Sequence, residues 1–367
     1  MKVVEINKKN FINNIEVVKK INSEKTPNTK IYAVVKGNGG GLDIVQYSRF
    51  LIENGINSLA VATYEESLKL REAGISEEIL MLSPTSIEEE LKMMVENDIT
   101  VTIGCFEELE LLKKVLKTLN KETYKVHLKI DTGFGRYGIL YSNIEEILKV
   151  FENAENVEIE GMFSHFGKAI EEKWTRTQFN RFMEVVKVLE EKALRPKILH
   201  ICASTAFLKY PEMRLDAVRI GSLFQGRTLL KNTGLIPIGV LKTKIAEIKN
   251  VPKGYTISYG NTYVTKRKTK IATIPVGHMD GFNRADKRED FTFKNNIIAI
   301  LMEVKKLFKD NHFKVKINGK EYKIIGRIGL CHTTIDITDG DDIKPGDEVI
   351  LDVPPLLINE VIRREYV

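Results

Sequence analysis

Several residue types that could do chemistry end or follow short apolar segments of this chain. Their groups are an amine that can form a Schiff base, two guanidinium forks, an imidazole, and hydroxyl and backbone donors suited to a phosphate. Each type also has a structural explanation, such as a surface lysine, a buried histidine or a serine that caps a helix. Only their joint occurrence indicates a site. The residues are Lys36, Arg136, His165, Ser204, Arg219, Gly221 and Ser222.

The glycines that follow Lys36 do not form a nucleotide-binding loop. The segment "GNGGGLD" lacks the G-K-[ST] of a P-loop, and no G-x-G-x-x-G can be placed there. We therefore expect these small residues to leave space beside the lysine for a bulky planar group.

Apolar segments rich in β-branched residues recur through the first 220 residues and must position these side chains. Amphipathic segments with helical spacing, such as "FEELELLKKVLKTLN", lie between most of them. This alternation predicts parallel strands with right-handed crossovers, and eight such units favour a (β/α)8 TIM-type barrel. Barrel enzymes build their sites at the carboxyl ends of the strands. The expected strands are 31–35, 58–62, 79–82, 99–103, 126–130, 159–164, 198–202 and 217–219.

The sequence pattern changes after Gly234. Segments such as "TKIATIPVG" and "DEVILDV" have strand lengths and are separated by turns rich in Gly, Pro and Asp. We therefore expect the barrel over residues 1–234 and a mostly-β domain over residues 235–367.

Composition excludes several classes of function. The 56 basic and 50 acidic side chains are interspersed, so the net charge of +6 forms no stripe for nucleic acid. No apolar run approaches the ~18 residues of a membrane span, and the N-terminus soon turns polar, so neither a membrane association nor a signal peptide is expected. Cys105, Cys202 and Cys331 form no C-x-x-C pair, which favours a cytoplasmic protein without a metal site.

The chain resembles the pyridoxal-phosphate-dependent alanine racemases over nearly its whole length. The resemblance implies an isomerase of fold type III that interconverts L- and D-amino acids by a two-base mechanism, with alanine as the default substrate. It also implies a homodimer whose active sites are shared between subunits. The matching segments, in order, are "AVVKGNGG", "KIDTGFGRYG", "SHFGKA", "HICASTA", "DAVRIGSLFQG", "ISYGNTY" and "IPVGHMDGFNR".

The same resemblance implies which residues move protons. Lys36 would hold pyridoxal 5'-phosphate covalently and act as one base, and Tyr259 would be the other base on the opposite face of the cofactor. His165 and Arg219 would lie beneath the ring near Tyr259. Arg219 would face the pyridine nitrogen, where an always-charged guanidinium disfavours protonation and weakens the ring as an electron sink.

The remaining roles are also carried over from the family. Ser204, Gly221 and Ser222 would hold the phosphate. Arg136 would engage the substrate carboxylate or the cofactor phenolate, positioned by Lys129, a lysine that is often carbamylated in this family.

The chain departs from the family pattern at five positions. Gly40 and His278 stand where the family has tyrosines, and Leu330 and Cys331 replace the methionine and aspartate of its C-M-D-Q segment. Asn359 aligns with a tyrosine that gates the pocket. Leu330 and Asn359 are therefore the expected substrate contacts from the second domain. The loss of bulk at Gly40 and Asn359 predicts a wider pocket, so a broad-specificity, serine, ornithine or lysine racemase is an alternative.

Three other interpretations remain open from the residues. A related pyridoxal-phosphate decarboxylase usually sets an acidic residue against the pyridine nitrogen, where this chain offers Arg219. A non-catalytic pyridoxal-phosphate carrier typically lacks the β domain. A barrel that binds no cofactor would lack the absorbance of the bound cofactor.

Overall fold

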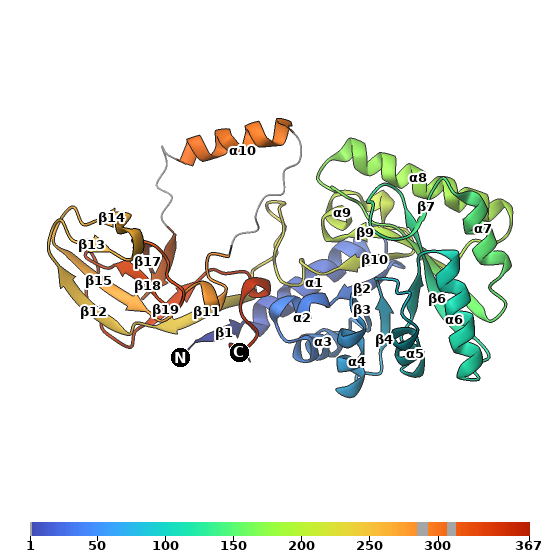
Figure 1. The fold of residues 1–367 in the computed structure, drawn as a ribbon, viewed down its shortest axis with the longest axis horizontal. Helices are drawn as coiled ribbons and strands as arrows, with labels where there is room; N and C mark the ends of the chain where they lie inside the picture. Colours follow the sequence, from blue (N-terminus) through green and yellow to red (C-terminus); the bar gives the residue numbers. More distant parts are fainter. Residues whose placement is uncertain (1, 285–292, 307–312) are drawn as a thin grey trace. The chain divides into compact units, whose positions relative to one another are not determined.

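The computed structural model describes residues 2–284, 293–306 and 313–367. The chain divides into two compact units (Figure 1). The first, which we call the barrel unit, is Lys8–Ile238. The second, which we call the β unit, combines Met1–Asn7 with Gly239–Val367.

The barrel unit contains a closed parallel sheet. The sheet order is β4-β3-β2-β10-β9-β8-β6-β5, and a parallel bridge between Leu80 and Thr100 joins its two edges. This confirms the predicted (β/α)8 barrel, and each strand ends within two residues of the expected position. The strands are β2 (Lys30–Val34), β3 (Ser58–Val61), β4 (Glu78–Met81), β5 (Val101–Ile103), β6 (Tyr124–Asp131), β8 (Val157–Phe163), β9 (Ile198–Ala203) and β10 (Ala217–Ile220), with β7 (Ile139–Leu140) paired to β6.

Helices surround this sheet (Figure 1). Each long helix buries one face, as α6 does with Leu109, Leu112 and Leu116 at helical spacing. The helices are α1 (Lys8–Lys25), α2 (Lys36–Gly41), α3 (Ile44–Glu53), α4 (Tyr64–Glu72), α5 (Glu88–Glu96), α6 (Phe106–Thr118), α7 (Ile144–Glu152), α8 (Glu172–Glu191), α9 (Ser204–Lys209) and the short η1 (Pro211–Met213).

Side chains from several strands fill the interior of the barrel. Tyr32, Ala60, Leu80 and Ala217 form one buried cluster. The core is not wholly apolar, since Tyr32 packs against the fully buried ring of His200, with 5.6 Å between the ring centroids.

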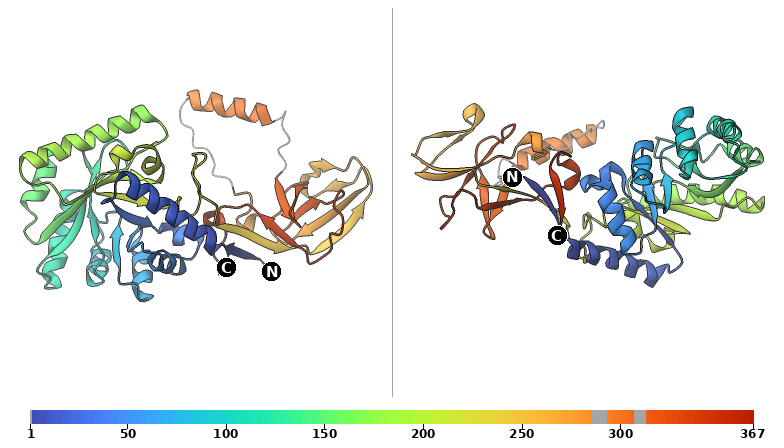
Figure 2. Two further views of the ribbon diagram at one scale, coloured as in Figure 1. Left: turned by 180° about the vertical axis from the view of Figure 1, so that it is seen from behind. Right: turned by 90° about the horizontal axis from the view of Figure 1, so that it is seen from below.

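The β unit is built on a nine-stranded sheet in the order β12-β15-β18-β17-β16-β19-β11-β1-β20, with β13 and β14 as a separate pair. Figure 2 shows this sheet from two further sides. Its other described elements are α10 (Phe293–Lys306), η2 (Tyr259–Asn261), η3 (His278–Asp280) and η4 (Pro355–Leu357). The strands are β1 (Val3–Ile6), β11 (Gly239–Lys244), β12 (Glu247–Val251), β13 (Thr256–Ile257), β14 (Tyr263–Val264), β15 (Thr269–Ile274), β16 (Lys314–Ile317), β17 (Lys320–Ile324), β18 (Thr333–Asp336), β19 (Glu348–Leu351) and β20 (Arg363–Tyr366).

The division of the chain differs from the expected 1–234 and 235–367 at its two ends. Strand β1 pairs antiparallel with β11 and parallel with β20, so the first seven residues belong to the β unit. The barrel unit also continues to Ile238, because Ile238 N–H donates to Gln225 O at 3.3 Å. Helix α10 is a helical element inside the unit for which we expected mainly strands. None of the helices within residues 2–284, 293–306 and 313–367 has the length and apolar character needed to span a membrane.

Candidate active site

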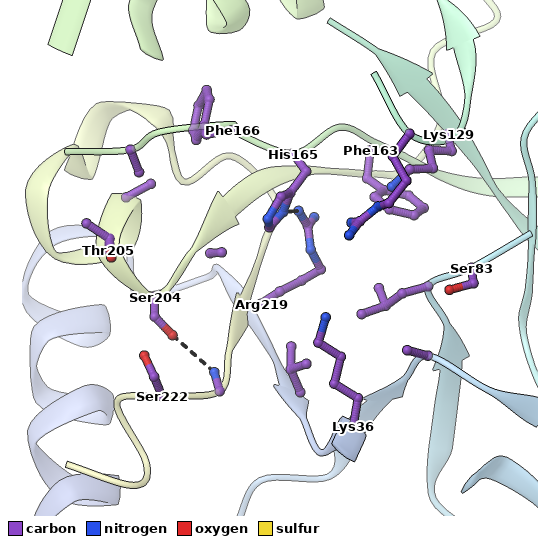
Figure 3. Close-up of a pocket in the computed structure, with 18 of the residues that line it drawn as sticks. Lys36, Ser83, Lys129, Phe163, His165, Phe166, Ser204, Thr205, Arg219 and Ser222 are labelled. Carbon is purple, nitrogen blue, oxygen red and sulfur yellow. Dashed lines mark hydrogen bonds between the residues drawn. The ribbon is translucent and has the colours of Figure 1, made fainter. Parts of the chain in front are cut away.

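A cavity of about 540 Å³ lies at the carboxyl ends of the barrel strands. Val34, Leu82, Phe163 and Phe166 give it apolar walls. The cavity brings together the barrel residues for which the sequence predicted a catalytic, cofactor-binding or substrate-binding role, most of which Figure 3 labels. These are Lys36, Lys129, Arg136, His165, Ser204, Arg219, Gly221 and Ser222.

The backbone after Lys36 makes a left-handed turn. Glycine adopts this conformation readily, whereas other L-residues lose about 1–2 kcal/mol each. The glycine run is therefore required by the backbone itself, which our expectation of space for a planar group did not foresee. The carboxylate of Glu66 fixes the turn by accepting hydrogen bonds from two of its N–H groups, at 2.5 and 3.1 Å. The turn residues are Gly37, Asn38, Gly39 and Gly40, with φ of 69°, 53°, 70° and 64°.

The absence of a side chain at Gly40 does not enlarge this cavity. Gly40 is buried and is not one of the lining residues. A Cβ atom at Gly40 would lie 1.8 Å from Nε2 of Gln225, so the Gln225 side chain already fills the space beside it. This corrects the expectation that Gly40 widens the pocket.

Four cationic side chains line the cavity, and none of its described lining residues is acidic. Partial burial and the nearby Arg136 lower the pKa of Lys36, an effect that Glu66 partly opposes. Burial lowers the pKa of Lys129 to about 7, and the charges of Arg219 and Arg136 add to this. Both amines therefore reach their neutral, nucleophilic form at a lower pH than an ordinary lysine does.

Arg219 is held by neutral acceptors. Its NH2 group donates to Ser164 O at 2.6 Å, Ile201 O at 3.2 Å and His165 Nδ1 at 3.2 Å. Its NH1 group donates to His200 Nδ1 at 2.6 Å and to the His200 carbonyl at 3.2 Å. Within the described part of the chain Nε–H has no acceptor, so it is the donor left for a ligand in the cavity (Figure 3).

Asp131 builds the turn that presents Arg136. Its Oδ1 accepts hydrogen bonds from the N–H groups of Gly133, Phe134 and Gly135, at 2.8, 2.8 and 3.2 Å. Arg136 follows this turn with its guanidinium 4.5 Å from the centroid of the Phe134 ring. Sequence reasoning missed Asp131, although an aspartate that opens a glycine-rich turn is a recognisable Asx-turn signal.

Ser204 and the backbone after β10 meet at the opposite side of the cavity from Ser83 (Figure 3). Gly221 N–H donates to Ser204 Oγ at 3.1 Å, which leaves the hydroxyl hydrogen of Ser204 for another acceptor. Leu82 and Ser83, which directly follow β4, also line the cavity. Sequence reasoning missed both, although the strand-end rule that found the charged residues could have found them.

The β unit carries Tyr259 on an exposed turn. Tyr259 is 75% exposed. It is the first residue of η2 and lies between Ser258 and Gly260, which both have positive φ. Ser258 Oγ donates to Arg327 O at 2.6 Å and fixes this turn. A Cβ atom at Gly329 would lie 3.7 Å from Cε2 of Tyr259, so the Tyr259 ring sits beside the segment that leads to Leu330.

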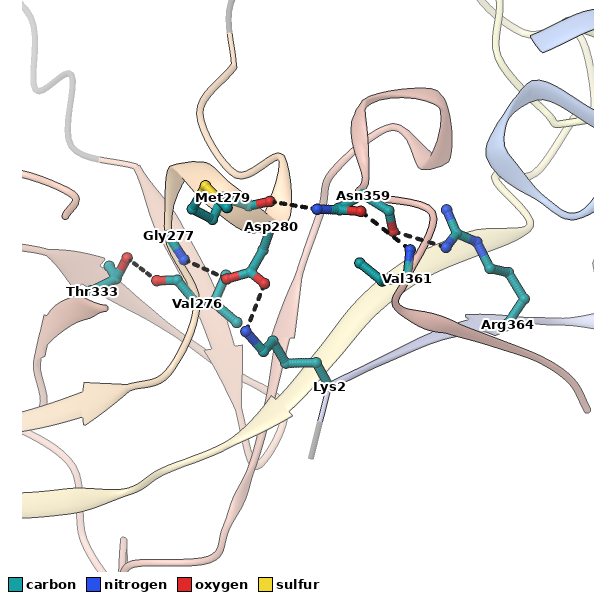
Figure 4. Close-up of polar contacts among 9 residues, drawn as sticks. All are labelled: Lys2, Val276, Gly277, Met279, Asp280, Thr333, Asn359, Val361 and Arg364. Carbon is teal, nitrogen blue, oxygen red and sulfur yellow. Dashed lines mark hydrogen bonds and ion pairs between the residues drawn. The ribbon is translucent and has the colours of Figure 1, made fainter. Parts of the chain in front are cut away.

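Asn359 holds a loop of the β unit together (Figure 4). Its Nδ2 donates to Met279 O at 3.1 Å, and its Oδ1 accepts from Val361 N–H at 3.2 Å. Leu330 is 62% exposed, and its carbonyl accepts from Met279 N–H at 2.9 Å. His278 directs Nδ1 to Phe282 O at 3.1 Å.

Comparison with known proteins adds evidence over nearly the whole chain. A family model described as alanine racemase, N-terminal domain, matches residues 6–228, and one described as alanine racemase, C-terminal domain, matches residues 238–356. The chain belongs to the alanine racemase family. It is an amino-acid racemase, which is an isomerase.

Individual relatives and solved structures that resemble this chain are also alanine racemases. Alanine racemase 2 of Caldanaerobacter subterraneus is 34% identical over 355 residues, which are 95% of this chain and 84% of that protein. The solved alanine racemase of Clostridium difficile 630 has a TM-score of 0.86 and 29% identity, covering 100% of this chain and 95% of that one. The alanine racemase of Bacillus anthracis, solved with bound L-Ala-P, has a TM-score of 0.82 and 30% identity, covering 100% and 95%.

Proposed function

We propose that this chain racemises alanine with pyridoxal 5'-phosphate bound in the barrel cavity and held covalently by Lys36. The observation that carries the proposal is an amine of lowered pKa among further cations, in a cavity whose described lining residues include no acidic one. Such a cavity suits an aldehyde that bears a phosphate dianion. The solved Bacillus anthracis relative with bound L-Ala-P supports alanine as the substrate.

The residues present fit this cofactor. The hydroxyl of Ser204 and the neighbouring Gly221 and Ser222 would hold the phosphate at the end of the cavity that Figure 3 shows opposite Ser83. Arg219 would meet the pyridine nitrogen through Nε–H. Because a guanidinium has donors and no acceptor, the nitrogen it faces must itself be the acceptor and stays unprotonated.

This arrangement favours racemisation over transamination and over decarboxylation. Bound pyridoxal phosphate supplies an electron sink for the charge left when a bond to the substrate's α-carbon breaks. Arg219 would limit that sink by keeping the ring nitrogen unprotonated, which favours return of the proton to the α-carbon over its transfer to the cofactor, the step that leads to transamination and pyruvate. The decarboxylase alternative would place a carboxylate at this position, and none lines the described cavity.

Two bases on opposite faces of the substrate would move the proton. Lys36 is one, and its lowered pKa leaves a neutral amine available to accept a proton. Tyr259 is the other. His165 accepts the Arg219 hydrogen bond through Nδ1, so its Nε2 hydrogen remains to orient the Tyr259 hydroxyl.

We assign the substrate carboxylate to Arg136. Lys129 would position Arg136 as a carbamate, because a lysine with a pKa of about 7 is neutral often enough to react with carbon dioxide. The carbamate would also add the negative charge that the described cavity lining lacks.

The active enzyme would be a homodimer with shared active sites. Tyr259 is 75% exposed in the single chain, and Leu330 and Met279 beside it are 62% and 50% exposed. A catalytic base works best where water is excluded. A second copy that covers this surface would bring Tyr259 to the cavity of its partner and bury the apolar side chains.

The breadth of the pocket depends on the β unit. Gly40 contributes no extra space, because Gln225 fills it. Leu330 and Asn359 remain our predicted substrate contacts, and serine, ornithine or lysine remain the alternative substrates.

We also infer a cytoplasmic location. The thiols of Cys105, Cys202 and Cys331 form no disulfide, which is typical of a protein in a reducing compartment.

The test is a product analysis of the loaded enzyme. We would incubate it with L-alanine and follow D-alanine by chiral chromatography, together with released carbon dioxide and pyruvate. The proposal predicts equal amounts of the two enantiomers at equilibrium with little carbon dioxide. Release of carbon dioxide as the main product, or recovery of unchanged L-alanine, would overturn it.

A further inference from the structure

Two histidines lie directly behind Arg219 in the barrel interior. His200 Nδ1 accepts from Arg219 NH1 at 2.6 Å, and His200 Nε2 lies 2.8 Å from His127 Nδ1. Both histidines are 0% exposed and Arg219 is 3% exposed. The three side chains therefore form a buried row in which each contacts the next.

The chemistry of the three groups determines where the protons sit. A guanidinium only donates, so His200 Nδ1 must carry a lone pair. Neutral His200 then has its hydrogen on Nε2 and donates it to His127 Nδ1. His127 must in turn carry its own hydrogen on Nε2, which has no hydrogen-bond partner in the described part of the chain.

Near neutral pH both rings are uncharged, so a second proton on either ring does not break this pattern. Burial lowers the pKa of His127 to about 3, and the Arg219 charge contributes. Burial and Arg219 also lower the pKa of His200 well below its usual value. A carboxylate in place of His200 would neutralise Arg219, whereas a neutral imidazole holds the guanidinium and leaves its charge intact.

We propose that His127 is a positioning residue for the ring-nitrogen contact of Arg219. The lone pair of His127 Nδ1 satisfies the His200 N–H, so His200 can keep its acceptor towards Arg219. With NH1 and NH2 held, the guanidinium presents Nε–H to the cavity. The consequence for catalysis rests on the function proposed above, whereas the proton pattern does not.

Gly161 provides the space that this pair needs. A Cβ atom at Gly161 would lie 2.4 Å from Cε1 of His127. The pairing of β6 with β8 shifts register between Val126 and His127, directly beside this point. Gly161→Ala should therefore displace the His127 ring and leave its chemistry unchanged.

The first experiment reads the protons without using activity. The chain has only six histidines, so selective ¹⁵N-histidine labelling of the full protein gives a resolvable spectrum. Single substitutions assign the signals of His127 and His200. We expect Nδ1 unprotonated and Nε2 protonated on both rings, with and without pyridoxal phosphate. Protonated Nδ1 on either ring would overturn the proposal and leave the proposed racemisation untouched.

The second experiment compares two substitutions in the loaded enzyme. His127→Asn keeps an acceptor oxygen near the position of Nδ1, and His127→Leu removes it at similar size. An orphaned buried N–H group weakens the hold on Arg219, so we expect kcat to fall about 10- to 100-fold in His127→Leu. His127→Asn should stay within about threefold of the original chain.

The ratio of products distinguishes positioning from packing. If Arg219 no longer faces the ring nitrogen firmly, His127→Leu should release more pyruvate per D-alanine formed, and Gly161→Ala should do the same. His127→Asn should keep the original ratio. A general loss of activity with an unchanged ratio in both His127→Leu and Gly161→Ala, or equal losses in His127→Leu and His127→Asn, would contradict a positioning role.

Discussion

Replacing Lys129 by methionine should stabilise the cofactor-free protein near neutral pH. Lys129 is 5% exposed, and its Nζ lies 4.3 Å from the centroid of the Phe163 ring. Burial lowers its pKa to about 7 from the usual 10.5, and the Asp131 charge offsets this only in part. Methionine has a similar length and needs no charge, so it should occupy this position at a lower free energy.

The size of the effect follows from the two pKa values of Lys129. The unfolded chain keeps its proton up to about pH 10.5 and the folded chain loses it near pH 7. Between these values the unfolded state binds more protons, so the free energy of unfolding rises with pH. Each pH unit corresponds to about 1.4 kcal/mol, which gives an upper bound of about 5 kcal/mol for the penalty below pH 7. We expect Lys129→Met to gain about 2–5 kcal/mol at pH 6.5.

The assay is urea unfolding of both proteins between pH 6 and pH 10, followed by the fluorescence of the single tryptophan, Trp174. The buffers must be free of carbon dioxide, because a carbamate on Lys129 would replace the amine. Lys125→Met is the control, since Lys125 is exposed on the same strand and its ammonium pairs with Glu160 at 2.6 Å. A gain that does not shrink towards pH 10, or a loss of stability in Lys129→Met at every pH, would contradict this prediction.

Three further predictions concern the turn, the second base and the substrate. Gly40→Ala should lower the free energy of unfolding by about 2–3 kcal/mol, because φ is +64° and Gln225 fills the space; Gln225→Ala in the same chain should restore part of it, and urea midpoints measure both. Mixing inactive Lys36→Ala with inactive Tyr259→Phe protein should recover partial racemase activity, because a heterodimer retains one complete site; no recovery by reassembled heterodimers would show that the bases come from one subunit. The kcat/KM for L-alanine should exceed that for L-serine, L-ornithine and L-lysine, and a higher value for a larger substrate would favour the alternative.

Much of the barrel could be predicted from the sequence, because buried parallel strands are continuous apolar runs bounded by turns. The same pattern located Lys36, His165 and Arg219, since each ends or follows a strand and barrels place their sites there. Tyr259 could not be found in this way. It lies in the β unit on an exposed turn, and only the family resemblance pointed to it.

Other features depend on information that a local pattern does not contain. Strand β1 joins the β unit through partners more than two hundred residues away, and a four-residue apolar segment does not reveal its partner. The positive φ of Gly40 and the position of the Gln225 side chain beside it depend on tertiary contacts. Nothing in the sequence distinguishes His127, because its contact with His200 joins two strands that are far apart in the chain. Helix α10 is different, because the helical spacing of its apolar residues was readable and was missed.

The proposed mechanism requires that Lys36 is the amine that carries the cofactor. The cavity offers a direct competitor, because Lys129 also lines it and also has a lowered pKa. The decisive measurement is borohydride reduction of the loaded protein, followed by peptide mapping of the modified lysine. We expect a single pyridoxyl label on Lys36, which disappears in Lys36→Ala without moving to Lys129. A label on Lys129, or on any other lysine of the unsubstituted protein, would contradict it.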